Sequence, residues 1–330
     1  MELKPPTVRV IKRLLGSGRL KDQLDARRQQ RFREVVGDGF TQRTGKRYTV
    51  VKPTGVTDSA RVGIYLRGGC DLPAVFTASQ LIRNAPKATY AIVRDSNLVS
   101  GSRSDFILQT LRDWDPEARR SMREVIERLS LRRNYFAPVI FDPTFELPGA
   151  PREGKFPKSV LVLSAAPDYS RSLYEHRQHG YLVDPGGFWL NTDMAGVLGD
   201  NATLKWFTSN FRQRGRMTSD EFRVSFGALL TEVERHLGCH VLVFNLLTVD
   251  PSDRTHSYGF TKQADTARRR EFTVALAELS AEHRFQVVDV DRILKLNGVG
   301  EMVDFAHFSE DQFLPIGTEV HRILGELELV

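Results

Sequence analysis

Three side chains that could do chemistry together lie near opposite ends of the chain. Cys70 ends the sequence Arg67-Gly-Gly-Cys70, between an apolar run typical of a buried strand and a segment with helical spacing. A thiol between a strand and a helix N-terminus occupies the position of a nucleophile in many α/β proteins, and the helix dipole favours the thiolate. Asp304 and His307 lie close to the other end. An imidazole facing the thiol could move its proton, with the carboxylate orienting the ring.

Two alternatives stay open beside this triad. Cys70 could be an inert buried cysteine, and His307 could be a hydrogen-bonded structural histidine. Ser96, in Arg94-Asp-Ser-Asn97, also follows a predicted strand and is a competing nucleophile. Against Ser96, an arginine stands where a tight turn would favour glycine, and no helix start follows. We therefore prefer Cys70.

The elements that would position these groups alternate between strands and helices from residue 59 onward. Short apolar runs predict strands at 62–66, 89–93, 160–163, 241–244 and 285–290. Helical spacing predicts helices at 73–82, 116–131, 219–236, 264–283 and 319–327. The alternation indicates an α/β fold with a doubly wound parallel sheet, a three-layer sandwich of the flavodoxin-like kind. The loops at 67–71, 94–101, 164–168 and 245–259 would then share one edge of the sheet.

Residues 170–215 do not fit the alternation. They are rich in aromatic residues and glycine, and we expect either an insertion or lid over the site or a packed structural excursion. No internal repeat is recognisable in the chain.

The order of these motifs resembles the SGNH/GDSL hydrolase superfamily, in which Gly-Asp-Ser, a glycine block, Gly-x-Asn-Asp and Asp-x-x-His follow one another. Gly68-Gly69-Cys70 corresponds to the first block, Gly101 to the second, and Asp304 with His307 to the last. The Gly-x-Cys block is similar to that of branches associated with polysaccharide biosynthesis, some of which transfer acetyl groups. The resemblance implies an SGNH-like α/β domain and a Cys70-His307-Asp304 triad.

The resemblance also implies where an oxyanion and a substrate would bind. Backbone N–H groups of Gly69, Cys70 and Gly101 would stabilise the oxyanion. The third block aligns with Ala165-Ala-Pro-Asp168, so its asparagine is missing, and Asn97 or Asn245 is the candidate replacement. Substrate binding is assigned to Arg67, Arg94, Ser96 and Asp168. Arg103 is expected on the same edge, where guanidinium groups would bind an anionic acyl donor.

Composition sets the remaining expectations. The 330 residues carry a net charge of +6, yet residues 1–50 alone hold 13 Lys/Arg and 5 Asp/Glu, so the rest is slightly acidic. Residues 1–58 are expected to form a basic extension, with two amphipathic helices within 7–36 and a connector, ahead of one domain at 59–330. No apolar run would cross a bilayer and no signal sequence is apparent, so a cytoplasmic location is expected. Two cysteines exclude a disulfide framework, and no metal site is predicted.

The function expected from the sequence is acyl transfer or ester and thioester hydrolysis. No tightly bound cofactor is expected; the donor could be coenzyme A, a carrier protein or an aminoacyl-tRNA. The acceptor would be a sugar hydroxyl or a small-molecule hydroxyl or amine. The alternative is a catalytically degenerate SGNH fold that binds a partner, with a basic arm for RNA or a membrane. The oligomeric state is left open.

Overall fold

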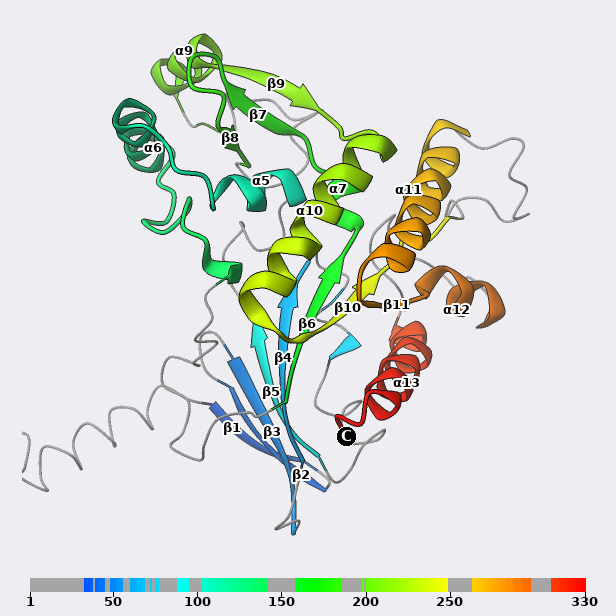
Figure 1. The fold of residues 1–330 in the computed structure, drawn as a ribbon. Coiled ribbons are helices and arrows are strands. Elements are labelled where there is room, and N and C mark those ends of the chain that lie inside the picture. Colours follow the sequence, from blue (N-terminus) through cyan, green and yellow to red (C-terminus); the bar gives the residue numbers. More distant parts are fainter. Residues whose placement is uncertain are drawn as a thin grey trace, which may run out of the picture.

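A central eight-stranded sheet with helices on both faces organises the protein (Figure 1). The computed structural model describes residues 33–37, 39–44, 48–55, 60–68, 72, 75–76, 88–94, 103–141, 158–184, 198, 200–248, 263–297 and 310–330. Five of the strands are parallel: β4 (Ala60–Arg67), β5 (Ala88–Arg94), β6 (Lys158–Ser164), β10 (His240–Phe244) and β11 (Gln286–Val288). The predicted α/β fold with a mainly parallel sheet is confirmed.

The order of the parallel strands locates a switch point. Across the sheet they run β5-β4-β6-β10-β11. After β4 the chain therefore adds β5 on one side and then crosses back to add β6 on the other. Open α/β sheets bind ligands outside the carboxyl ends of the two strands where the order reverses. In this chain those strands are β4 and β6.

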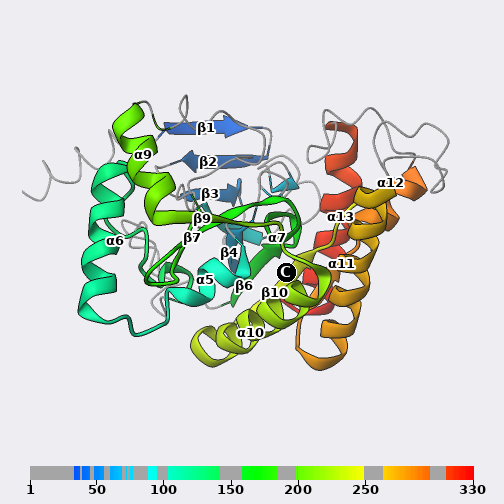
Figure 2. The same ribbon diagram turned by 90° about the horizontal axis from the view of Figure 1, so that it is seen from above.

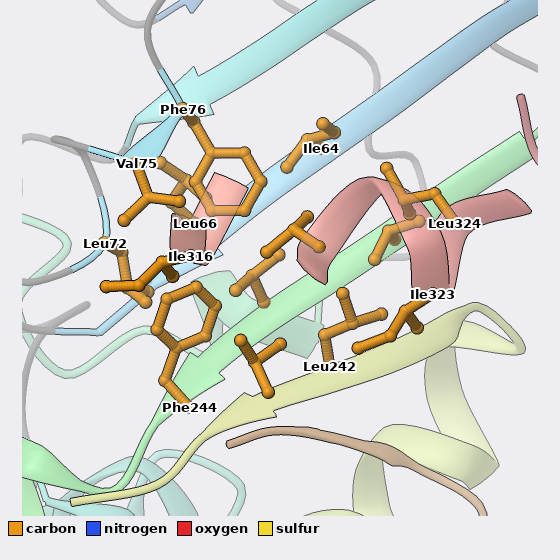
Figure 3. Close-up of a cluster of buried hydrophobic side chains, with 14 of the residues drawn as sticks. Ile64, Leu66, Leu72, Val75, Phe76, Leu242, Phe244, Ile316, Ile323 and Leu324 are labelled. Atoms are coloured by element: carbon orange, nitrogen blue, oxygen red, sulfur yellow. The ribbon is translucent and has the colours of Figure 1, made fainter. Parts of the chain in front are cut away.

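Alternation along the central strands builds two separate cores. On β4, Ile64 and Leu66 belong to one buried cluster and Tyr65 to the other. The first cluster lies under α12 (Val290–Asn297) and α13 (Glu310–Glu326), as Figure 3 shows for α13. The second lies under α10 (Ser219–Leu237) and α11 (Gln263–Glu282). Strands buried on both faces read as continuous apolar runs, which is why the sequence predicted them well.

Helix ends follow from local sequence signals. Thr218 and Glu221 form a reciprocal capping box at the start of α10, and Gly238 ends that helix with a φ of 55°. α6 (Pro116–Arg128) has proline at its first helical position. The side chain of Asp115, just before it, caps the helix by accepting hydrogen bonds from two backbone N–H groups of the first turn. Each boundary lies within a few residues of its prediction.

An antiparallel extension continues the sheet beyond β5. β1 (Arg33–Gly37), β2 (Phe40–Thr44) and β3 (Tyr48–Pro53) form a meander, and β3 pairs with β5. The helix predicted up to residue 36 is wrong at 33–36, where pairing with β2 favours an extended chain. The sheet thus includes strands on both sides of the expected 58/59 boundary, while residues 1–32 lie outside the described part of the chain.

A second small sheet forms within the expected insertion. It contains β7 (Leu173–His176), β8 (Leu182–Val183) and β9 (Phe211–Gly215), in the order β8-β7-β9, and is followed along the chain by α10. With α6 and α9 (Asn201–Asn210) it encloses its own aromatic core. In Figure 1 this subdomain lies beyond the carboxyl ends of β4 and β6, and seen from above it overlies part of the sheet (Figure 2).

Candidate functional site

At the candidate site, the chain just after β4 packs closely against the end of β6. Gly68 follows β4 directly, and a Cβ placed on it would lie 2.5 Å from Leu72 Cδ1 and 2.8 Å from Ser164 Cβ. Both distances are well inside van der Waals contact. A side chain at this position would force Leu72 or Ser164 to move, so the close packing at the switch point favours glycine.

Most of the predicted catalytic residues lie outside the described residues. These are Gly69, Cys70, Ser96, Asn97, Gly101, Asp304 and His307. Their described neighbours lie at one end of the sheet. Leu72 and Ile316 belong to the same buried cluster, and Figure 3 shows both at the end of the sheet where β10 carries Phe244. The segment with Asp304 and His307 leads directly into α13, the helix that carries Ile316.

The arginines expected to bind an anionic donor differ in their surroundings. Arg67 is buried, and its Nη1 donates to the Leu66 carbonyl at 3.1 Å. Arg103 is only 1% exposed and is turned into the protein. Arg94 ends β5 at the expected edge, and its side chain is outside the described set. The structure thus gives two of the three guanidinium groups internal partners.

Asp168 contacts the segment that follows β5. It lies in α7 (Ala166–Ser170), just after β6, and is 2% exposed. Its Oδ1 accepts the Ser104 backbone N–H at 2.8 Å and the Ser104 hydroxyl at 2.6 Å. Ser104 begins α5 (Ser104–Gln109). Substrate binding by Asp168 stays a prediction; in this structure its carboxyl group joins two loops of the sheet edge.

Burial of Asp168 should make folding stability depend on pH. Loss of hydration raises its pKa to about 7, against a partly opposing effect of the Ser104 hydrogen bonds. The folded state then holds a proton that the unfolded state releases near pH 4. Protonated Asp168 therefore contributes fully to the free energy of unfolding below pH 4, and this contribution is lost as the pH rises to about 7. We expect the free energy of unfolding of the wild type, relative to Asp168→Asn, to fall across this range by up to about 4 kcal/mol. Urea unfolding of both proteins at several pH values measures this difference in free energy. A difference that stays constant with pH would contradict the prediction.

The Asn245 side chain, a candidate replacement for the missing third-block asparagine, is held by partners near the start of α12, and its role at an oxyanion stays a prediction. Its Nδ2 donates to Asp289 Oδ1 at 2.7 Å, and its Oδ1 accepts the Asp291 N–H at 3.3 Å. The side chain thus ties the end of β10 to the start of α12. Asp291 also accepts from the N–H and hydroxyl of Thr248, and from Lys295 at 2.6 Å. Sequence reasoning missed this network because its members become neighbours only across two strands.

A serine–histidine contact in the small subdomain resembles a nucleophile–base pair. Ser121 Oγ lies 3.2 Å from His176 Nε2. However, His176 Nδ1 accepts the backbone N–H groups of Gln178 and His179, at 3.3 and 3.2 Å. In the neutral ring the proton is therefore on Nε2, which cannot accept the serine proton. The contact orders the 176–181 turn and is not a catalytic dyad.

The remaining cysteine provides a useful contrast to Cys70. Cys239 is a free thiol at the edge of the second core, and burial raises its pKa to about 11. It is accordingly a poor nucleophile at neutral pH. The described ranges contain no group of three or more His, Cys, Asp or Glu placed to hold a metal ion. None of the helices in those ranges has both the length and the apolarity of a membrane span.

Comparison with known proteins returns no matching family model and no matching curated protein. Solved structures do match. Esterases and lipases are among them. An acetylxylan esterase from Geobacillus stearothermophilus matches at 11% identity and a TM-score of 0.37, covering 81% of this chain and 95% of that one.

Two further matches are of the same kind. A protein described as a GDSL-like lipase, from Parabacteroides merdae, has 11% identity and a TM-score of 0.34, with 82% of this chain and 98% of that one covered. A phospholipase A1 from Streptomyces albidoflavus has 9% identity and a TM-score of 0.34, covering 78% and 98%. At such distances the fold is judged from the topology of the sheet, and the chemistry from this chain's own residues.

Proposed function

We propose that this protein transfers acyl groups through a covalent intermediate on Cys70, to water or to an acceptor hydroxyl or amine. The observation that carries the proposal is the turn at Gly68. Gly68 directly follows β4, one of the two strands at the switch point of the sheet, and Cys70 comes two residues later in the sequence. α/β folds commonly carry their reacting groups at this point. The shared cluster of Leu72 and Ile316 supports a role for His307, nine residues before Ile316.

The reaction would proceed in two balanced steps. In the first, the Cys70 sulfur attacks the acyl carbonyl, His307 takes the thiol proton, and the oxyanion accepts hydrogen bonds from the N–H groups of Cys70 and Gly101. Collapse breaks the bond to the leaving group, which receives the proton from His307, while Asp304 orients the ring. In the second step, water or an acceptor attacks the thioester, with its proton passing through His307 back to sulfur.

The donor and acceptor follow less directly from the residues described. Arg94 is the arginine left to meet an anionic donor such as coenzyme A, a carrier protein or an aminoacyl-tRNA, since Arg67 and Arg103 have internal partners. A thioester intermediate suits transfer to an amine or a sugar hydroxyl as well as hydrolysis. The esterases and lipases found by comparison are consistent with ester chemistry in general.

Trapping the acyl group tests the proposal. The Cys239→Ala protein, which keeps Cys70 as its single cysteine, is incubated briefly with p-nitrophenyl acetate or acetyl coenzyme A and digested with trypsin. We expect one acetyl group on the peptide 68–83. An acetyl group on the peptide 95–103 would instead assign the nucleophile to its serines, Ser96 first. Absence of any acyl peptide and of turnover would favour the binding-module alternative.

A further inference from the structure

The outermost strand of the central sheet, β1, is exposed on both of its faces. Successive side chains of a strand point to opposite faces, and Val35 and Val36 are 42% and 76% exposed. β1 pairs with β2 on one side, and in the described part of the chain no strand pairs with its other side. Figure 2 shows β1 at the outer edge of the sheet. A free edge that carries apolar side chains is a template for pairing with another strand.

The other strand edges within the described ranges have features that normally prevent such pairing. At the far end of the central sheet, β11 has only three residues. In the small sheet β8 has only two, and β9 carries exposed Arg212 and Arg214 and pairs with β7 in an irregular register. β1 has five residues in regular register and contains neither proline nor lysine. It is therefore the described edge best suited to accept a further strand.

A printed hydrogen bond fixes which backbone groups of β1 point outward. The Thr54 N–H donates to the Gly39 carbonyl at 2.9 Å, so the backbone of Gly39 faces β3. Because the facing side alternates along an antiparallel strand, the backbone of Gln42 faces β1, where Val35 stands opposite it. Val35 thus bonds to β2. The N–H and C=O groups of its two neighbours in β1 point into the open edge.

The charges of the strand select one register for pairing of this edge with itself. The outward-facing neighbours are Glu34 and Val36. Pairing Glu34 with itself would oppose like charges, and pairing Val36 with itself would align only residues 35–37. Pairing Glu34 with Val36 of a second copy avoids both problems and places Val35 opposite Val35. Within each copy Arg43 of β2 stands opposite Glu34, so the edge brings a compensated charge to the contact.

We propose that two copies of this protein associate through antiparallel pairing of β1 with β1, about a two-fold axis at Val35. Each of the two Glu34–Val36 pairs exchanges two backbone hydrogen bonds, and the exposed valines become partly covered. The central sheet then continues from one copy into the other. One strand from each copy is a small contact area, so the dimer is expected to be weak and dependent on concentration. The association is independent of the proposed acyl transfer.

Sedimentation velocity of the full chain, from about 1 to about 500 μM, measures this association. We expect the wild type to shift from monomer to dimer across the range. Val36→Pro removes an N–H that points into the open edge and leaves the bonds to β2 in place. The Kd for dimerisation should therefore rise by at least about tenfold.

Two charged substitutions at one position test the register. Val36→Glu opposes Glu34 of the second copy with a like charge and should raise the Kd by about tenfold. Val36→Lys opposes the same carboxylate with an opposite charge and should keep the Kd within about threefold of the wild type. Val224→Glu is the matched control, because Val224 is a valine of α10 that is 70% exposed and lies far along the chain from β1. No change of Kd is expected for it.

A cysteine cross-link locates the two-fold axis. In the Cys70→Ala, Cys239→Ala protein, Val35→Cys brings two thiols onto a directly opposed pair, whose Cα atoms are about 4.5 Å apart. A disulfide spans that distance, so oxidation by copper phenanthroline should give a covalent dimer. Val36→Cys places its two thiols on different rows of the ladder, more than about 7 Å apart between Cα atoms, and should give little cross-link.

Several outcomes would overturn the proposal. One is a wild type that remains monomeric at about 500 μM, whatever else covers the edge. Another is a dimer whose Kd is the same in Val36→Glu and Val36→Lys, and this comparison also serves if Val36→Pro does not fold. Cross-linking through Val36→Cys as efficient as through Val35→Cys would contradict the register.

Discussion

Replacement of Cys70 by alanine is expected to lower the turnover of p-nitrophenyl acetate by at least about 10³-fold, since removal of the nucleophile leaves only binding and oxyanion stabilisation. His307→Ala should have a comparable effect, because without a base the thiol proton has no acceptor in the site. Initial rates below the KM of the ester, compared with the uncatalysed rate, measure both changes. Thermal unfolding of each variant checks that the fold is intact.

Matched controls make the first result specific. Cys239→Ala removes the other thiol, whose raised pKa keeps it protonated, and turnover should be retained. Cys70→Ser tests whether an oxygen nucleophile works in this site, and a measurable residual rate is expected. Full activity in Cys70→Ala with loss in Ser96→Ala would transfer the nucleophile to Ser96.

The central sheet could be predicted from sequence because its signal is local. Val160–Leu163 reads as a continuous apolar run, and such runs identify strands that are covered on both faces. The sequence also predicted which loops share one edge of the sheet, since parallel strands place their carboxyl ends together. The Gly68 turn was recognised from its glycines, although the close approach to Ser164 was not, because those two residues are distant in the chain.

The contacts around the site could not be predicted, because they join residues far apart in the chain. Ser104 and Asp168 are 64 residues apart, and Arg103 and Gly215 are 112 apart. From the sequence, Arg103 was one of several arginines expected near the site edge. Only its burial in the structure shows that its guanidinium group binds other parts of the protein instead of facing a ligand. β1 was missed for the same reason, since five residues become a strand by pairing with β2.

Arg103→Met is expected to cause a large loss of stability, because the Arg103 side chain is buried in a charge pair. Removing one partner from a buried, hydrogen-bonded charge pair costs about 3–5 kcal/mol, because the remaining groups stay desolvated. Here the Asp105 carboxylate would lose its two bonds from Arg103 and keep the one from the Phe106 N–H, and the Gly215 carbonyl would lose its Arg103 donor. Arg214, whose Nε lies 3.6 Å from Asp105 Oδ2, can partly compensate, so the lower end of that range is expected.

Arg212→Met is the matched control for this loss. Arg212 also donates two N–H groups to a carboxylate, that of Glu175, but its side chain is 61% exposed. Water can replace its hydrogen bonds, so the expected cost is only about 0–1 kcal/mol. Urea unfolding followed by circular dichroism, with equal m-values, compares the two variants directly. Equal losses of unfolding free energy would show that Arg103 stabilises the protein no more than an exposed arginine does. A much larger loss for Arg103→Met would mean that burial, and not the number of hydrogen bonds, makes Arg103 stabilise the contact between the sheet edge and the small subdomain.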